Sequence, residues 1–282
     1  MLTPARCSIN TATLGYKEPI SKVIEQVARH GFGAIAPWRR EVEGGDVVAI
    51  ARQIREAGLS VSGYCRSSPI PTDSAATREA QYQENRRALA DAATLGAACF
   101  VIVAGGLPRA SRDIGDARAQ VEEGLARLLV DARTLGVSIA IEPLHPMYAA
   151  DRCCVNTLAQ ALDMCARLDP DHAGGIGVAI DAYHVWWDPD LAAGIRRAGS
   201  ERRLNAFHIC DWLVPTTDLL MDRGMIGDGV IDLSAMTNQV NATGFEGYAE
   251  IEIFSTRWWS TENEETLRVC ADRLRTASGT SA

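Results

Sequence analysis

Short apolar runs alternate along the chain with longer stretches in which apolar and polar residues are mixed. Each run has five or six residues, and several are apolar nearly throughout, as expected of parallel strands buried on both faces. The predicted strands lie at residues 6–10, 33–37, 60–64, 98–103, 137–142, 176–181, 204–208 and 248–252. The mixed stretches predict helices at residues 17–30, 45–57, 75–95, 112–135, 156–168, 189–198, 233–242 and 261–276.

A repeated phrase marks the passage from helix to strand. Ala57-Gly58-Leu59, Leu95-Gly96-Ala97 and Leu135-Gly136-Val137 each place a glycine, which can adopt a positive φ, between a helix end and a strand. Eight such units without a Pro/Gly/Ser-rich linker predict an α/β protein, a single (β/α)8 TIM barrel at 1–282 with a frayed tail at 276–282. An open doubly wound sheet is the rival, but no GxGxxG follows the first predicted strand.

The composition and charge mainly exclude classes of partner and of protein. The 282 residues are 47% hydrophobic and 23% charged, which is ordinary for a globular protein with a large core. A net charge of −8 disfavours nucleic acid as a partner, and no apolar run is long enough to cross a membrane. Eight dispersed cysteines and no visible export signal predict reduced thiols and a cytoplasmic location. Whether the chain forms a homo-oligomer stays open.

The last four predicted strands each end in an acidic residue or a histidine. These residues are Glu142, Asp181, His208 and Glu252. Because the carboxyl ends of barrel strands meet at one mouth, we expect the four side chains to lie together. Three carboxylates and an imidazole suit a divalent ion such as Mn²⁺, Mg²⁺ or Co²⁺, and without an ion the carboxylates would repel one another. The pattern therefore predicts a metal site.

The sequence around these residues carries a resemblance. Glu142-Pro143, Asp181-Ala182-Tyr183-His184, Phe207-His208 and Ile251-Glu252 are similar to the sugar isomerase/epimerase superfamily with the xylose-isomerase-like TIM barrel. The resemblance covers nearly the whole chain. It includes ketose 3-epimerases, hydroxypyruvate isomerase, inosose-processing enzymes and apurinic endonuclease IV, and it does not single out one substrate.

The resemblance implies a metal-dependent isomerase or epimerase of an unphosphorylated keto sugar or related polyol ketone. It implies that Glu142 and Glu252, besides binding the ion, act as acid and base on opposite faces of an enediolate. One ion is expected, Mn²⁺ first, with Mg²⁺, Co²⁺ and Zn²⁺ as alternatives. The same chemistry can expel a β-leaving group, so a metal-dependent dehydratase or lyase of keto sugars stays open. A non-catalytic sugar-binding or partner subunit is the contrasting class.

Five further residues are expected to bind the substrate. His184 matches the family histidine three residues after the aspartate, and Arg223 matches the family arginine four residues before a Gly-x-Gly. A guanidinium there can bind substrate oxygens bidentately. Trp38, Tyr64 and His145 follow predicted strands closely and are placed on the same rim.

Two features of the sequence narrow the class of substrate. Endonuclease IV reads Asp-Arg-His where this chain has Asp222-Arg223-Gly224, so together with the negative charge the DNA-repair activity is disfavoured. Barrels often bind phosphate with Gly-rich loops after the last two strands. Here Asp228 sits between two glycines, and the stretch Phe254-Ser255-Thr256-Arg257 is not Gly-rich, which favours a neutral sugar.

Overall fold

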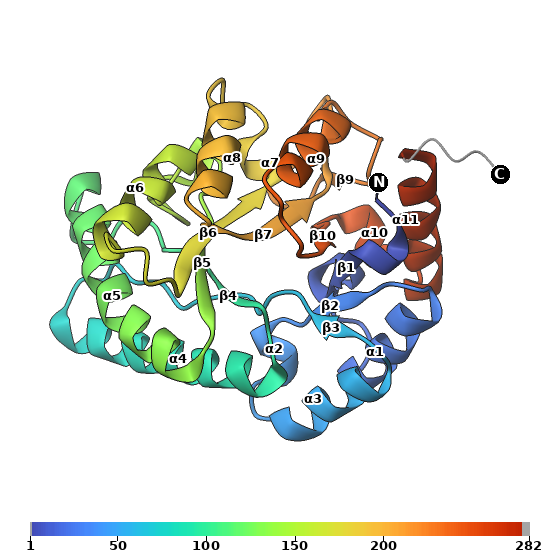
Figure 1. Ribbon diagram of the computed structural model, residues 1–282, viewed down its shortest axis with the longest axis horizontal. Coiled ribbons are helices and arrows are strands. Elements are labelled where there is room, and N and C mark those ends of the chain that lie inside the picture. Colours follow the sequence, from blue (N-terminus) through green and yellow to red (C-terminus); the bar gives the residue numbers. More distant parts are fainter. Residues whose placement is uncertain (1, 278–282) are drawn as a thin grey trace.

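Eight parallel strands form a ring with helices around it in the computed structural model, which describes residues 2–277 (Figure 1). The sheet order is β3-β2-β1-β10-β7-β6-β5-β4, and parallel bridges from Val61 to Ala97 and from Tyr64 to Phe100 connect its two ends. The predicted TIM barrel is confirmed. The strands are β1 (Cys7–Asn10), β2 (Ala34–Ala36), β3 (Ser60–Val61), β4 (Cys99–Ile102), β5 (Ser138–Ile141), β6 (Ile176–Asp181), β7 (Leu204–Ile209) and β10 (Ala249–Ile251).

Each predicted helix range contains most of a long helix. These are α1 (Ile20–Arg29), α3 (Val47–Glu56), α4 (Ala75–Leu95), α5 (Ile114–Leu135), α6 (Leu158–Leu168), α8 (Leu191–Ser200), α9 (Leu233–Ala242) and α11 (Asn263–Ala277). Gly96 and Gly136 end α4 and α5 with φ of 71° and 70°, as the repeated phrase predicts. The tail predicted at 276–282 begins inside α11, and its residues 278–282 lie outside the described ones.

Short elements that the sequence pattern did not reveal follow the strands at the mouth of the barrel. They are too short to show a helical or strand period. They comprise the helices α2 (Arg39–Val42), α7 (Ala182–Val185) and α10 (Thr256–Ser260), the 3₁₀ turns η2 (Thr11–Leu14) and η3 (Pro146–Tyr148), and the hairpin of β8 (Asp211–Trp212) with β9 (Arg223–Gly224); a further 3₁₀ turn, η1 (Pro4–Arg6), precedes β1. Among the described residues, no helix is both long and apolar enough to cross a membrane.

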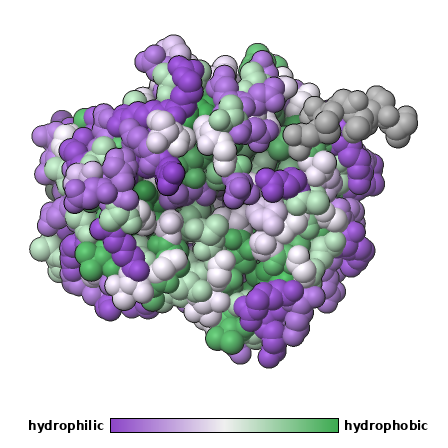
Figure 2. Space-filling view, viewed as in Figure 1, coloured by the Kyte–Doolittle hydropathy of each residue, from purple (hydrophilic) through white to green (hydrophobic). Residues whose placement is uncertain are grey.

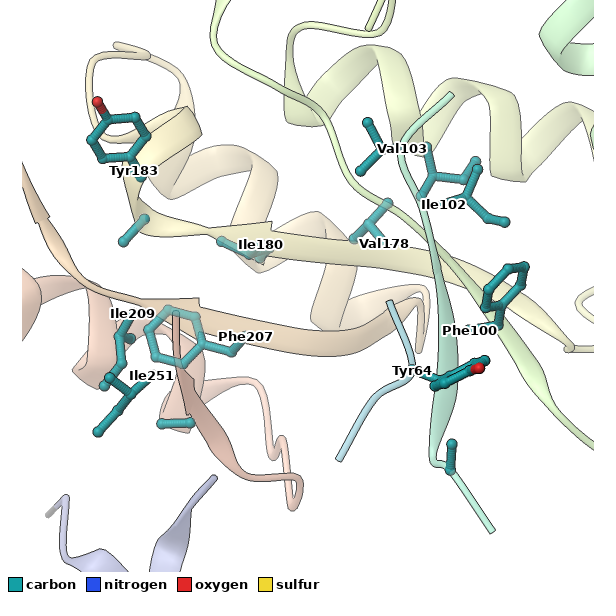
Figure 3. Close-up of a cluster of buried hydrophobic side chains, with 14 of the residues drawn as sticks. Tyr64, Phe100, Ile102, Val103, Val178, Ile180, Tyr183, Phe207, Ile209 and Ile251 are labelled. Atoms are coloured by element: carbon teal, nitrogen blue, oxygen red, sulfur yellow. The ribbon is translucent and has the colours of Figure 1, made fainter. Parts of the chain in front are cut away.

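Alternate strand residues fill two separate layers. Large side chains such as Phe100, Ile180 and Phe207 lie in the main hydrophobic cluster, which the helices share (Figure 3). Figure 2, which has the view of Figure 1, shows hydrophilic residues over much of the rim. A second cluster of mostly small side chains belongs to the other face of the strands and fills the barrel interior: Cys65, Cys99, Val101, Ala140, Ala179 and Ala206.

This alternation places the polar residues of the site. Glu142, Asp181 and His208 each come two residues after an alanine of the interior cluster, so they share its inward direction one step nearer the mouth. Small side chains below them leave room for carboxylates and an imidazole inside the ring.

Candidate active site

The structure brings the four predicted metal ligands together. Glu142, Asp181, His208 and Glu252 each offer one donor atom, and these atoms all lie within 4.8 Å of one another. All four side chains are buried. The residues come from the carboxyl ends of β5, β6, β7 and β10. These four strands are neighbours in the ring, in the order β10-β7-β6-β5.

The donor set fits one divalent cation. Donors on opposite sides of an ion with bonds of about 2.1–2.3 Å lie roughly 4.2–4.6 Å apart, slightly less than the 4.8 Å within which the four donor atoms lie. His208 Nδ1 lies 2.9 Å from Glu142 Oε1, so these two donors already face the same point. Three carboxylates carry more negative charge than a single neighbouring arginine offsets, and a divalent ion supplies the balance.

Arg223 is the buried cation beside the four ligands. Its Nη1 donates to Asp181 Oδ2 at 2.9 Å and to Glu252 Oε2 at 3.0 Å, and its guanidinium lies 4.6 Å from the ring centroid of Tyr183. Its place in β9 explains this contact, because the β8–β9 hairpin follows β7 at the mouth. The sequence predicted Arg223 as a substrate residue; the structure adds that it binds two of the predicted metal ligands.

Burial and neighbouring charge act differently on the two carboxylates that Arg223 contacts. Burial disfavours the charged form of Asp181, but the positive charge of Arg223, together with a hydrogen bond from the backbone N–H of Tyr183, outweighs it and lowers the pKa of Asp181. At Glu252 burial dominates, Arg223 opposes it and the carboxylate of Glu142 adds to it, so the pKa of Glu252 rises to about 8. In the absence of an ion, Glu252 is therefore largely protonated at neutral pH.

A pocket of about 190 Å³ is lined by two of the four candidate ligands, Glu142 and Glu252. Arg223 and His184 also line it. Burial lowers the pKa of His184 to about 3, so its imidazole is neutral at neutral pH. Further lining comes from Trp38, Cys65, Arg66, Val103, Leu144, Tyr148, Arg152, Leu220 and Phe254.

The five predicted substrate residues differ in their distance from this pocket. Trp38, His184 and Arg223 line it. His145 lies behind it: its backbone N–H donates to His184 Nδ1 at 3.3 Å, and its ring stacks on Trp212. Tyr64 is fully buried in the outer layer against Phe100 (Figure 3), so the structure brings its neighbours Cys65 and Arg66 to the pocket instead.

Two polar residues of the site were missed in the sequence. Asn10, at the end of β1, donates from Nδ2 to Glu252 Oε1 at 3.0 Å and accepts at Oδ1 from Trp38 Nε1 at 2.7 Å. Glu250 lies two residues before Glu252 and is also buried. The signals were present: a polar residue closes the first strand, and two glutamates alternate with isoleucine in the last.

The chain matches a family model over most of its length. Residues 24–276 match the family described as xylose isomerase-like TIM barrel. An inosose isomerase of Bacillus licheniformis is 28% identical over 160 residues, which cover 56% of this chain and 54% of that protein. An inosose isomerase of Halalkalibacterium halodurans is 24% identical over 151 residues, 52% and 50% of the two chains. The chain thus spans about half the length of the curated relatives it matches.

Solved structures are similar along nearly the whole chain. Protein SMc04130 of Sinorhizobium meliloti 1021 has a TM-score of 0.93 and 50% identity, covering 96% of this chain and 98% of that one. IolI with a bound zinc atom has a TM-score of 0.81 and 19% identity, with 96% and 97% covered. D-psicose 3-epimerase of Clostridium cellulolyticum H10 with D-tagatose has 0.78 and 15%, with 97% and 98% covered. At these lower identities the likeness is one of fold.

Proposed function

Because the chain belongs to the family of xylose isomerase-like TIM barrels, we propose that it is a divalent-metal-dependent isomerase or epimerase of an unphosphorylated keto sugar or related polyol ketone. The observation that carries the proposal is the buried group of Glu142, Asp181, His208 and Glu252 beside a pocket. The inosose isomerases among its relatives act, by name, on a ketone of this class. We propose Mn²⁺ as the first ion to test, with Zn²⁺ next because IolI binds zinc, and residues 1–282 as one catalytic domain.

The reaction needs a proton taken from the carbon beside a carbonyl. An epimerase returns a proton to that carbon, and an isomerase delivers it to the former carbonyl carbon. Glu142 and Glu252 both line the pocket, from β5 and β10, which β6 and β7 separate in the ring. They therefore approach a bound substrate from different sides, one as base and the other as acid. The ion, bound by Glu142, Asp181, His208 and Glu252, supplies Lewis-acid stabilisation of negative charge on the substrate oxygens.

Arg223 and His184 orient the substrate in this proposal. The Arg223 guanidinium is held by Asp181 and Glu252, so it presents its remaining N–H groups in a fixed direction. His184 Nε2 lies 3.1 Å from Arg223 Nη2, which places a neutral imidazole beside the guanidinium at the pocket wall. Both groups suit hydroxyl or carbonyl oxygens of a sugar.

The loop after β7 supports an unphosphorylated substrate. The backbone N–H groups of Gly227, Gly229 and Ile231 donate to the carboxylate of Asp211 at 3.0, 2.9 and 3.0 Å. In many TIM barrels the amides of this region bind a phosphate. Here a buried aspartate occupies them and adds a negative charge.

Phosphate esters should therefore be poor substrates. For whichever ketose the enzyme converts, the ester at the carbon farthest from the carbonyl should show kcat/KM at least about tenfold lower, because the backbone amides that could bind a phosphate already donate to Asp211. Steady-state kinetics with the ketose, its ester and the uncharged methyl ether of the same hydroxyl measures this. The ether controls for bulk. Equal kcat/KM for ester and free sugar would show that phosphate is accommodated.

Metal content and metal removal test the proposed function. We expect about one divalent ion per chain by elemental analysis, loss of activity with a chelator, and recovery with Mn²⁺. Activity is measured as exchange of the α proton of ketoses with D₂O and as product formation. His208→Ala should bind Mn²⁺ at least about tenfold more weakly, and the exposed His172→Ala should not. Full occupancy of His208→Ala at limiting Mn²⁺ would rule out the four-ligand site.

A further inference from the structure

One buried carboxylate of the barrel interior has no part in the function proposed above. Glu250 lies two residues before Glu252 on β10, so its side chain points inward one layer below the pocket. It pairs in register with His208 on β7 and with Ser8 on β1. Its exposed fraction is 2%.

Neutral donors fix both oxygens of this carboxylate. Asn10 Nδ2 donates to Glu250 Oε1 at 2.7 Å, and Ser62 Oγ donates to Oε2 at 2.7 Å. Among the described residues, the ion-pair contact of Glu250 is with His208, whose Nε2 lies 3.6 Å from Oε1. A buried carboxylate without an arginine or lysine is costly unless a positive group or N–H faces it.

The imidazole of His208 lacks a hydrogen-bond acceptor at Nε2 within the described part of the chain, and a carboxylate such as Glu250 can supply one. Its Nε2 is buried and has no hydrogen-bond partner among residues 2–277, while Nδ1 lies 2.9 Å from Glu142 Oε1. A neutral imidazole carries one N–H and one lone pair. If the proton were on Nδ1, it would be donated to Glu142 and the ring would offer the ion no lone pair on that side. With the proton on Nε2, the Nδ1 lone pair faces Glu142 Oε1, a donor atom of the candidate metal site.

We propose that Glu250 is a positioning residue that accepts the Nε2–H of His208 and so keeps the Nδ1 lone pair directed at the ion. The proposal rests on the metal-dependent function above. Closing the gap from 3.6 Å to an ordinary hydrogen bond takes a movement of about 0.7 Å. Histidines that bind metals are commonly oriented in this way by a carboxylate on the other ring nitrogen.

The surroundings of Glu250 allow a clean test. A cavity of about 640 Å³ reaches Glu250 and Ser62 from the amino-terminal ends of the strands, so water can fill the space that a shorter side chain leaves. Ser8 provides a matched control, because it is fully buried in the same layer. Its hydroxyl lies 2.7 Å from the hydroxyl of Ser62, and Ser8 is not one of the four candidate metal ligands.

The experiment measures the dissociation constant of Mn²⁺ for the full-length protein without sugar, by competition with a chelator. Glu250→Ala should raise it by about 10- to 100-fold. Glu250→Gln keeps an acceptor oxygen and should raise it less. Ser8→Ala should change it less than about twofold. Metal-free Glu250→Gln should melt close to the wild type, because the Ser62 hydroxyl can turn and accept a hydrogen bond from the NH₂ group of the glutamine.

A double-mutant cycle with His208→Ala separates positioning from simple loss of charge. If Glu250 acts through His208, adding Glu250→Ala to His208→Ala should change the dissociation constant little. An equal effect of Glu250→Ala with and without His208, or equal effects of the Ala and Gln replacements, would overturn the proposal. A wild-type protein that binds no Mn²⁺, Zn²⁺ or Co²⁺ would instead overturn the proposed function itself.

Discussion

Glu142→Gln and Glu252→Gln should each lose at least about 100-fold in net conversion of the substrate. The amide can still offer an oxygen to an ion, but it cannot take up a proton at neutral pH. The loss should exceed that caused by weaker metal binding, so turnover is compared at saturating Mn²⁺. Product formation by chromatography and α-proton exchange with D₂O by NMR are measured in parallel.

The two variants should differ in stability. Both oxygens of Glu252 accept hydrogen bonds, Oε1 from Asn10 and Oε2 from Arg223. A glutamine there must turn its NH₂ group toward one of these donors, which costs about 1–3 kcal/mol. Glu142 contacts His208 Nδ1 through Oε1. A glutamine there can keep its carbonyl oxygen toward His208 and direct its NH₂ group away from it. Thermal melts above pH 8, where Glu252 is ionised, should therefore rank Glu252→Gln below Glu142→Gln.

Proton exchange distinguishes an epimerase from an isomerase. In a 3-epimerase, one variant should keep exchanging the α proton without inverting the centre, because removal and return from one face need a single carboxylate. An aldose–ketose isomerase need not show this separation. Glu41→Gln is the control, since Glu41 is a half-buried carboxylate beside Trp38 that does not line the pocket. Wild-type turnover in both Glu142→Gln and Glu252→Gln with metal bound would show that the base lies elsewhere.

Replacing Arg223 by methionine should destabilise the metal-free protein by about 3–5 kcal/mol. Asp181 and Glu252 would both lose the cation that their carboxylates contact at 2.9 and 3.0 Å. Mn²⁺ should recover more stability in this variant than in the wild type, because the ion then offsets a larger excess of negative charge. Urea unfolding with and without Mn²⁺ measures both effects, and turnover should fall because the group that orients the substrate is gone.

Arg203→Met is the matched control for this prediction. Arg203 is as buried as Arg223 and contacts Asp169 and Glu201 with its guanidinium at 3.4 and 3.2 Å, but it lies at the opposite end of the barrel strands. Its loss should lower stability without changing the stabilisation by Mn²⁺. If Mn²⁺ stabilises both variants equally, the carboxylates that Arg223 contacts do not bind an ion.

The sequence by itself determined the barrel and placed four candidate metal ligands at its mouth. Both follow from local rules: buried strands and amphipathic helices have different periods, and parallel strands in a barrel end on the same side. Glu142, Asp181, His208 and Glu252 could therefore be assigned to one place before any distance was known, and the structure brings their donor atoms within 4.8 Å.

Only the tertiary structure decided what surrounds those ligands. Closure of the ring sets β1 beside β10, which brings Asn10 to Glu252 across 242 positions of sequence. A hairpin too short to show a period delivers Arg223 to Asp181. Tyr64 and Cys65 are neighbours in sequence, yet the course of the chain after β3 sends one to the outer core and the other to the pocket. Such contacts depend on register and closure, which no local pattern encodes.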